Sequence, residues 1–341
     1  MILQWRNDMT ITIKDVALEA GVSIATVSRV INGKDRVKLA TKKKVEEVIK
    51  KLNFKPDNTA RTMIVKETKT IGLIVPSLNE YWARISEVIQ ERLWESGYAL
   101  MLCATGGVLF EKERFYLNSF IERKVDGIIY CGRHSERDAI INDYLTADIP
   151  IITFDRKIDG IDRVFGDHMQ GAMKAVEHLI RLGHQKIAYI GGPLSFPDRE
   201  LGYRNAHTVN GLSVDEALLK RGDFRFEFGY LAAEELLRDK LDFTAIFCGN
   251  DLIAFGVIEA LKKASIRVPE DIAIVGYDDI QMASLVKPAL TTVRQPIVEM
   301  GCAIVELLKE SMKNQNHIPK NLMFPMELIV RESCGAAHKK M

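Results

Sequence analysis

From residue 70 onward, short apolar runs alternate with amphipathic helical stretches such as ARISEVIQERLWESG (83–97), and this alternation restricts the fold most strongly. Apolar runs without an alternating polar face are typical of strands that are buried on both faces of a parallel sheet. Helices between them then cover those faces. The expected strands are TIGLIVP (70–76), YALMLCAT (98–105), VDGIIYCG (125–132), PIITFDR (150–156), KIAYIGG (186–192), FTAIFCGND (243–251) and DIAIVGYDD (271–279).

Seven strands are more than one small sheet needs, so the pattern favours two doubly wound lobes with a ligand site between them. Polar residues at the carboxyl ends of the strands support such a site, because open α/β sheets place ligand contacts there. Any one of these side chains is explained equally well as a cap of the following helix, but five together favour a site. They are Asp155, Asn250, Asp251, Asp278 and Asp279.

The segment IKDVALEAGVSIATVSRVIN (13–32) predicts two short helices separated by a tight turn at Gly21. Thr12 and Asp15 fit a capping box at the start of the first helix, and Ser23 is placed to cap the second. The apolar residues that recur at helical spacing are Ile13, Val16, Ala17, Ala20, Val27, Val30 and Ile31.

A third helix is predicted by TKKKVEEVIKKLNF (41–54), in which lysines cover the face opposite the apolar stripe. The first 69 residues contain 15 Lys and Arg against 8 Asp and Glu, whereas the rest contains 32 against 38. A small basic head on a mildly acidic body is therefore expected. Such a head suits a polyanionic partner, although a basic surface is more often only a solvated face.

The five cysteines are scattered without a C-x-x-C pair, so we expect reduced structural thiols. The N-terminal residues lack the apolar core of a signal peptide, and no apolar run approaches the length of a membrane span. These features favour a cytoplasmic protein.

Motifs for enzyme chemistry are missing: the sequence contains no G-x-G-x-x-G, no G-x-x-x-x-G-K-[ST], no H-E-x-x-H and no G-x-S-x-G. The seven histidines show no metal-ligand spacing. Asp155 and Asp278 could converge as a carboxylate pair, but nothing pairs them with a nucleophile or a metal. We therefore expect a binding site without cofactor or metal rather than an active site.

Several long motifs, in this order, resemble the lactose/galactose-repressor (LacI/GalR) family of bacterial transcription regulators from about residue 10 to residue 333. They are TIKDVALEAGVSIATVSRVING, KVEEVIKKLNFKPDNTAR, RLGHQKIAYIGGP, TAIFCGNDLIAFGVIEALK, VPEDIAIVGYDDI and PALTTVRQP. The resemblance implies a three-helix helix-turn-helix head, a hinge helix and a core of two periplasmic-binding-protein-like α/β lobes. The implied boundaries are 10–56 for the head, 57–69 for the hinge and linker, and 70–335 for the core, with lobe one at 70–163 plus 296–325 and lobe two at 164–295 plus 326–335.

Carried over from the family, the second helix is the recognition helix, with Ile24, Ala25 and Arg29 as base-reading residues. An arginine can read guanine, while small or apolar side chains permit close approach to the major groove. The implied phosphate contacts are Ser23, Thr26, Ser28 and Asn32, and the implied hinge contacts are Asn58, Arg61 and Met63. Met63 stands where the family has a leucine that wedges into the minor groove; ordinary packing of the hinge is the alternative. Lys38 stands where the family often caps the third helix with serine.

The family's effector pocket carries over to seven residues of mixed aromatic and polar type: Tyr81, Trp82, Asp155, Arg199, Phe224, Asn250 and Asp278. Aromatic faces pack against the C–H surface of a sugar, while the polar groups hydrogen-bond its hydroxyls. We therefore expect a carbohydrate or its phosphorylated or acidic derivative; a purine is the alternative, because the same groups suit a stacked base. The loop from Pro193 to Arg199 is shorter than in familiar members, so donors found there elsewhere do not carry over.

The resemblance further implies a homodimer that binds a near-palindromic DNA operator and responds to a small-molecule effector. After RESC the chain has no heptad run, so a zipper-mediated tetramer is not expected. The alternatives are a small-molecule binding protein without a DNA role, which Arg29 and the basic head argue against, a sugar-active enzyme, and a regulator with a phosphoprotein corepressor. Induction and corepression are equally compatible with the sequence.

Overall fold

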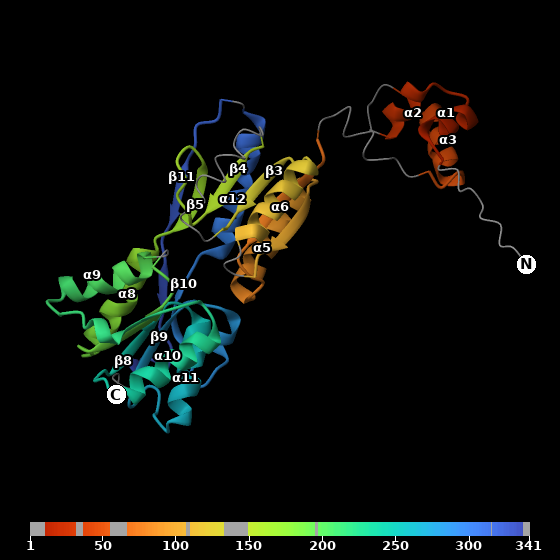
Figure 1. The fold of residues 1–341 in the computed structure, drawn as a ribbon. Helices are drawn as coiled ribbons and strands as arrows, with labels where there is room; N and C mark the ends of the chain where they lie inside the picture. Colours follow the sequence, from red (N-terminus) through yellow and green to blue (C-terminus); the bar gives the residue numbers. More distant parts are fainter. Residues whose placement is uncertain are drawn as a thin grey trace, which may run out of the picture. The chain divides into compact units, whose positions relative to one another are not determined.

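A computed structural model describes residues 11–31, 37–54, 67–106, 110–132, 149–194, 197–314 and 316–336, and the chain divides after Thr68 into two compact units (Figure 1). Each unit is described by itself. The expected hinge segment and Asn32 lie outside the described residues, except for residues 67–69. None of the described helices is both long enough and apolar enough to span a membrane.

The first unit contains three helices in its described part: α1 (Ile13–Ala20), α2 (Ile24–Ile31) and α3 (Leu39–Lys51). The Asp15 carboxylate accepts hydrogen bonds from the Thr12 N–H at 2.8 Å and the Thr12 hydroxyl at 2.7 Å, which fixes the start of α1. Gly21 ends the helix in the left-handed conformation at φ 61°. The predicted apolar stripes meet in one core, formed by Val16, Ala17, Ala20, Val27, Val30, Val45, Val48 and Phe54.

The second unit contains two six-stranded sheets in the described part of the chain, one in each lobe (Figure 1). The first sheet is parallel throughout and has the order β11-β5-β4-β3-β1-β2. Its strands are β1 (Thr70–Val75), β2 (Ala99–Ala104), β3 (Gly127–Tyr130), β4 (Ile151–Phe154), β5 (Asp162–Gly166) and β11 (Asn321–Phe324). Apolar clusters lie on both faces, beneath α5 (Glu80–Glu95) and α12 (Ile297–Lys313) on one side and α6 (Phe110–Glu122) on the other.

The second sheet has the order β12-β10-β9-β8-β6-β7, and only β12 pairs antiparallel among the strands described there. Its strands are β6 (Ile187–Gly191), β7 (Leu219–Arg221), β8 (Ala245–Cys248), β9 (Ala273–Asp278), β10 (Thr291–Arg294) and β12 (Glu327–Ile329). Figure 1 shows α8 and α9 together on one side of this sheet and α10 and α11 on the other. These helices span α8 (His168–Arg181), α9 (Asp198–Val209), α10 (Phe226–Arg238) and α11 (Asp251–Lys263), and short 3-10 turns span Glu216–Leu218 and Gln281–Ser284.

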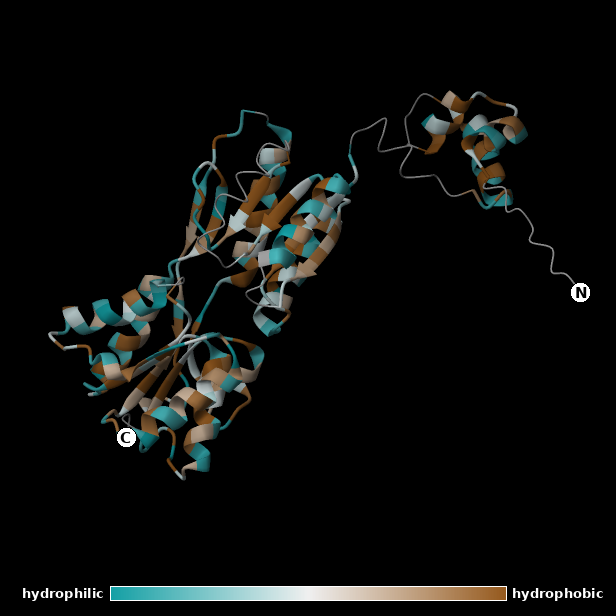
Figure 2. Ribbon diagram, in the orientation of Figure 1, coloured by the Kyte–Doolittle hydropathy of each residue, from teal (hydrophilic) through white to brown (hydrophobic). Residues whose placement is uncertain are grey.

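Hydropathy follows this layered arrangement (Figure 2). The strands are mostly apolar, whereas the helices carry polar residues on their outer faces. All seven strands expected from continuous apolar runs are present. The sequence analysis missed five others, β5, β7, β10, β11 and β12, because most of them contain charged side chains that interrupt an apolar run.

The chain passes between the lobes three times: after β5, between β10 and α12, and between β11 and β12. The expected first boundary, between residues 163 and 164, is wrong, because it falls inside β5. That strand pairs with β4 and β11 of the first sheet from Asp162 through Gly166. The lobes also touch through their cores, since Ile280 of the second lobe is buried in the apolar cluster of the first.

Candidate functional site

The outward face of α2 carries the predicted base-reading residues. Val27 and Val30 are buried against the other helices, whereas Ile24, Ala25 and Arg29 are exposed. Such a helix, apolar on one side and free of acidic residues, is suited to entering the major groove of DNA.

The predicted phosphate contacts flank the same face. Ser23 is exposed, and its Oγ accepts a hydrogen bond from the Thr26 N–H at 3.2 Å, as expected for a cap of α2. Thr26 and Ser28 are partly exposed. The other predicted DNA contacts lie outside the described residues: Asn32, Asn58, Arg61 and Met63.

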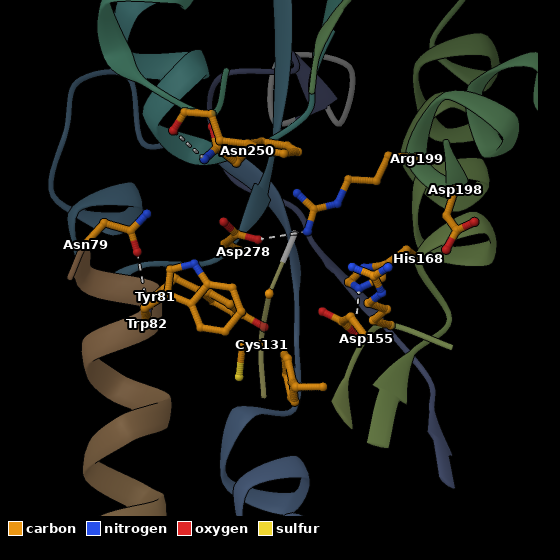
Figure 3. Close-up of a pocket in the computed structure, with 14 residues that line it drawn as sticks. Asn79, Tyr81, Trp82, Cys131, Asp155, His168, Asp198, Arg199, Asn250 and Asp278 are labelled. Atoms are coloured by element: carbon orange, nitrogen blue, oxygen red, sulfur yellow. Dashed lines mark hydrogen bonds and ion pairs between the residues drawn. The ribbon is translucent and has the colours of Figure 1, made fainter. Parts of the chain in front are cut away.

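A cavity of about 100 Å³ lies between the two lobes, and the structure brings all seven predicted effector residues into its lining (Figure 3). Seven further lining residues were not predicted: Asn79, Cys131, Gly132, Phe154, Arg156, His168 and Asp198. Five of these stand beside predicted residues or at the expected end of a strand, and Asn79 lies two residues before Tyr81, so their position in the sequence was a usable signal. His168, at the start of α8, had no such signal.

The first lobe supplies an aromatic wall. Asn79 caps α5 by accepting a hydrogen bond from the Trp82 N–H at 3.1 Å, which places Tyr81 and Trp82 on the first turn. The rings of Tyr81 and Trp82 lie edge to face with centroids 5.1 Å apart, and Trp82 contacts Phe154 in the same way. The Tyr81 hydroxyl donates to Gln295 Oε1 at 3.0 Å. Burial raises the pKa of this phenol well above its ordinary value, so it remains a hydrogen-bond donor.

Asp155 follows β4 and adopts a positive φ of 61°, a backbone conformation that non-glycine residues rarely take. Its Oδ1 accepts a hydrogen bond from the Gly166 N–H at 3.1 Å and lies 3.0 Å from His168 Nε2. Burial alone would raise the pKa of Asp155, but His168 and the Gly166 N–H outweigh burial and lower it. The carboxylate is therefore charged at neutral pH. Strained backbone at such a group is typical of ligand-binding sites.

Arg199 and Asp278 form the polar wall of the second lobe. One guanidinium nitrogen lies 3.4 Å from Asp278 Oδ1, and another donates to the carbonyl of Gly249. The guanidinium also stacks 3.9 Å from the ring centre of Tyr277. Burial would lower the pKa of Arg199, but Asp278 leads the groups that outweigh burial and raise it. Gln295 donates a further bond of 2.7 Å to Asp278 Oδ1.

The other polar residues at the strand ends have structural roles. Asn250 lines the cavity, but its Oδ1 caps α11 by accepting from the Ile253 N–H at 2.9 Å. Asp251 is buried outside the lining and accepts from the Thr292 hydroxyl at 2.6 Å. Asp279 also lies outside the lining and pairs with two arginines, Arg294 and Arg331. For Asp251 and Asp279, the structural interpretation of the sequence pattern was the better one, whereas Asn250 both caps α11 and lines the cavity, so its contact with an effector stays a prediction.

Among the described residues, no group of three or more His, Cys, Asp or Glu side chains is arranged to hold a metal ion. The five cysteines are all free, as expected. The cavity is thus lined by aromatic rings, carboxylates and a paired guanidinium, a set suited to binding a small polar molecule.

Comparison with known proteins gives two family matches. Residues 12–57 match the model described as bacterial regulatory proteins, lacI family, and residues 176–334 match a periplasmic binding protein-like domain. The chain is 35% identical over 329 residues to the HTH-type transcriptional repressor PurR of Vibrio atlanticus (strain LGP32), covering 94% of this chain and 98% of that protein. It is 33% identical to catabolite control protein A of Priestia megaterium, covering 95% and 99%.

Solved structures agree with these matches. The lac repressor dimer bound to operator and the anti-inducer ONPF superposes with a TM-score of 0.87 at 29% identity, covering 95% of this chain and 99% of that one. The complex of the transcriptional regulator CelR with cellobiose gives a TM-score of 0.72 at 31% identity, with the same coverage. The chain therefore belongs to the lacI family of bacterial regulatory proteins, which are DNA-binding transcriptional repressors controlled by an effector and not enzymes.

Proposed function

We propose that this protein represses genes of carbohydrate use and that a sugar or sugar derivative, bound between the two lobes, controls its affinity for operator DNA. The observation that carries the proposal is the composition of the cavity, where Trp82 and Phe224 supply aromatic faces beside Asp155, Asp278 and Arg199. A sugar ring offers an apolar C–H face and several hydroxyls at once. A ligand without hydroxyls would leave the polar groups of the cavity without hydrogen-bond partners, and its binding affinity would fall.

Solved relatives support a sugar ligand by analogy. One transcriptional regulator of the same fold is complexed with cellobiose, one from Enterococcus faecium has bound ribose, and one from Alkaliphilus metalliredigens is complexed with D-xylulofuranose. Each of these ligands is a neutral polyhydroxylated molecule. An aromatic wall opposite carboxylates matches such ligands chemically.

A purine is the second candidate. Trp82 and Phe224 offer faces on which a planar base can stack, and Asp155, Asp278 and Arg199 offer hydrogen-bonding groups at its edge. The difference between the two candidates is the number of hydroxyl donors that the ligand brings to the carboxylates. A sugar brings several, whereas a purine base brings few N–H groups.

For DNA, we propose that Arg29 reads a guanine in the major groove while Ile24 and Ala25 fit against thymine methyl groups or the groove floor. We assign phosphate contacts to Ser23, Thr26, Ser28 and Asn32, and hinge contacts in the central minor groove to Asn58, Arg61 and Met63. These assignments rest on the family resemblance and, for the residues on α2, on their exposure.

We further propose that the protein acts as a homodimer on a near-palindromic operator, because a two-fold protein matches a two-fold site. One relative of the same fold is a lac repressor dimer on its operator. Light scattering that gives twice the 38.5 kDa mass of one chain would support the dimer, and a mass of one chain at operator-binding concentrations would contradict it.

The test of the proposed function is a selection of random duplex DNA on the purified full chain at near-physiological salt. Three arms receive no addition, a mixture of neutral sugars, or a mixture of purine bases. Enrichment of a near-palindrome that changes only in the sugar arm supports the proposal, whereas a change only in the purine arm favours the second candidate. If no arm yields a site, the DNA role proposed for the α2 face is wrong, unless adding a cell extract that supplies a protein corepressor restores enrichment.

A further inference from the structure

His168 lines the cavity and contacts one residue of each lobe. Its Nε2 lies 3.0 Å from Asp155 Oδ1, and its Nδ1 lies 3.1 Å from the hydroxyl of Tyr277. Asp155 follows β4 of the first lobe, whereas Tyr277 belongs to β9 of the second, and His168 is the first residue of α8. Figure 3 shows the imidazole beside the Asp155 carboxylate, on the side of the cavity where Arg199 and Asp198 also lie.

The hydrogen bonds around this imidazole have a consistent direction. Burial raises the pKa of Tyr277, so its hydroxyl keeps its proton and can donate to Nδ1. A neutral imidazole that accepts at Nδ1 carries its proton on Nε2 and donates it to the charged Asp155 carboxylate. In its neutral form the ring is therefore held in one tautomer, with Tyr277 bonded to Nδ1 and Asp155 bonded to Nε2.

One oxygen of Asp155 is fully engaged by these contacts. Oδ1 receives both the His168 ring N–H and the Gly166 N–H, at 3.0 and 3.1 Å. Within the described parts of the chain, no hydrogen bond reaches Oδ2 of Asp155. Since a carboxylate oxygen accepts about two hydrogen bonds, Oδ2 is the atom of Asp155 that remains for a ligand hydroxyl in the cavity.

We propose that His168 is a positioning residue of the effector site, which fixes the Asp155 carboxylate so that Oδ2 accepts a hydroxyl of the effector. The proposal rests on the proposed function, because it takes the cavity as the effector site. Gly166 and His168 flank the first passage of the chain between the lobes, and both bond to the same oxygen. An effector hydroxyl that bonds to Asp155 is therefore linked to both ends of this passage through Gly166 and His168. His168 extends the link to Tyr277 in the second lobe.

The first test needs no ligand. Nitrogen-15 spectra of the full chain with labelled histidine, with the His168 signal assigned by its loss in His168→Gln, should give a ring fixed as the Nε2–H tautomer. In Tyr277→Phe, which removes the hydroxyl that faces Nδ1, the Nδ1 signal should shift while Nε2 remains protonated. A wild-type ring that averages between its two tautomers, or that carries its proton on Nδ1 alone, would overturn the proposal.

The second test measures binding of D-ribose and of cellobiose by calorimetry. His168→Phe removes the donor to Asp155 and should weaken binding of the recognised sugar about tenfold or more, as expected for a lost hydrogen bond to a charged group. His168→Gln can still donate to Asp155 and should stay within about threefold of wild type. His184→Gln is the matched control, because His184 bonds to Thr244 and does not line the cavity.

The outcomes separate the two proposals. Equal affinity in wild type and His168→Phe, with His168→Phe folded by circular dichroism, would show that His168 does not position the site. If His168→Phe fails to fold, the tautomer of the wild-type ring and the sugar affinity of His168→Gln show whether His168 positions Asp155. If wild type binds neither sugar, the carbohydrate assignment loses its support, and the tautomer measurement still judges the role of His168.

Discussion

The guanidinium of Arg199 lies 3.4 Å from the carboxylate of Asp278, and both side chains are largely buried in the wall of the cavity. Their charges neutralise each other, so neither member of this pair is an uncompensated buried charge. Both residues therefore belong to the proposed effector site, as part of the cavity lining, and should stabilise the second lobe, as a buried ion pair.

Removing one partner of this pair should destabilise the fold. Arg199→Ala removes the buried guanidinium that pairs with the Asp278 carboxylate, and we expect a loss of about 2–4 kcal/mol in the free energy of unfolding. Arg238→Ala is the control, because the Arg238 side chain is 73% exposed and its pair with Asp239 should contribute less than about 1 kcal/mol. Urea unfolding of both variants measures the difference, and equal midpoints would contradict the buried-pair interpretation.

Asp251 should make the free energy of unfolding depend on pH above about 3.8. Burial and the neighbouring Asp278 raise the pKa of Asp251 well above its ordinary value of 3.8, so the folded state binds a proton that the unfolded state releases. The free energy of unfolding should therefore fall as pH rises from about 3.8 through the raised pKa.

Asp251→Asn should flatten this part of the pH profile, since asparagine has no proton to release. Thermal melts between acidic and neutral pH give the comparison, with Asp271→Asn as a control. The carboxyl of Asp271 is paired with Arg267, and its pKa is lowered to about 2, so it should not produce a fall over the same range. An unchanged slope in Asp251→Asn would show that other groups cause the dependence.

Arg29 should contribute to sequence discrimination rather than to general DNA affinity. Replacing it with alanine should weaken binding to the selected operator by about 1–3 kcal/mol. Arg29→Lys keeps the positive charge but loses the bidentate geometry that reads guanine, so it should bind scrambled DNA like wild type and still bind the operator weakly. Fluorescence anisotropy with both duplexes separates these effects, and equal losses on both would reduce Arg29 to a phosphate contact.

The close packing of α10 against α11 leaves no room for a methyl group at Gly229. A Cβ there would run into the backbone carbonyl of Ile253, because the two helices approach closely at this point. Gly229→Ala should therefore cost about 1–3 kcal/mol of stability, although alanine is the better helix former. Leu231→Ala on the same helix is the control, since Leu231 is 62% exposed; a melting temperature for Gly229→Ala at or above that of wild type would contradict the packing argument.

Much of the architecture was predictable because it depends on local periodicity. Continuous apolar runs predicted the central strands of both sheets, and helical spacing on both sides of Gly21 and in residues 41–54 predicted the three-helix head. The family resemblance led to all seven predicted cavity residues. Strand β5 was missed because its five residues, DRVFG, alternate between buried and partly exposed positions and contain two charges.

The sequence alone determined which segments form strands or helices wherever a regular pattern of apolar residues runs along the chain, since residues close in sequence set such a pattern. Tertiary structure decided which strand ends meet. Asp155 and Asp251 occupy equivalent places after apolar runs, yet one lines the cavity and the other is bonded to Thr292 in the core. His168 joins Asp155 only because the chain passes to the second lobe after Gly166. That passage depends on pairing between strands that are distant in sequence, which local patterns do not encode.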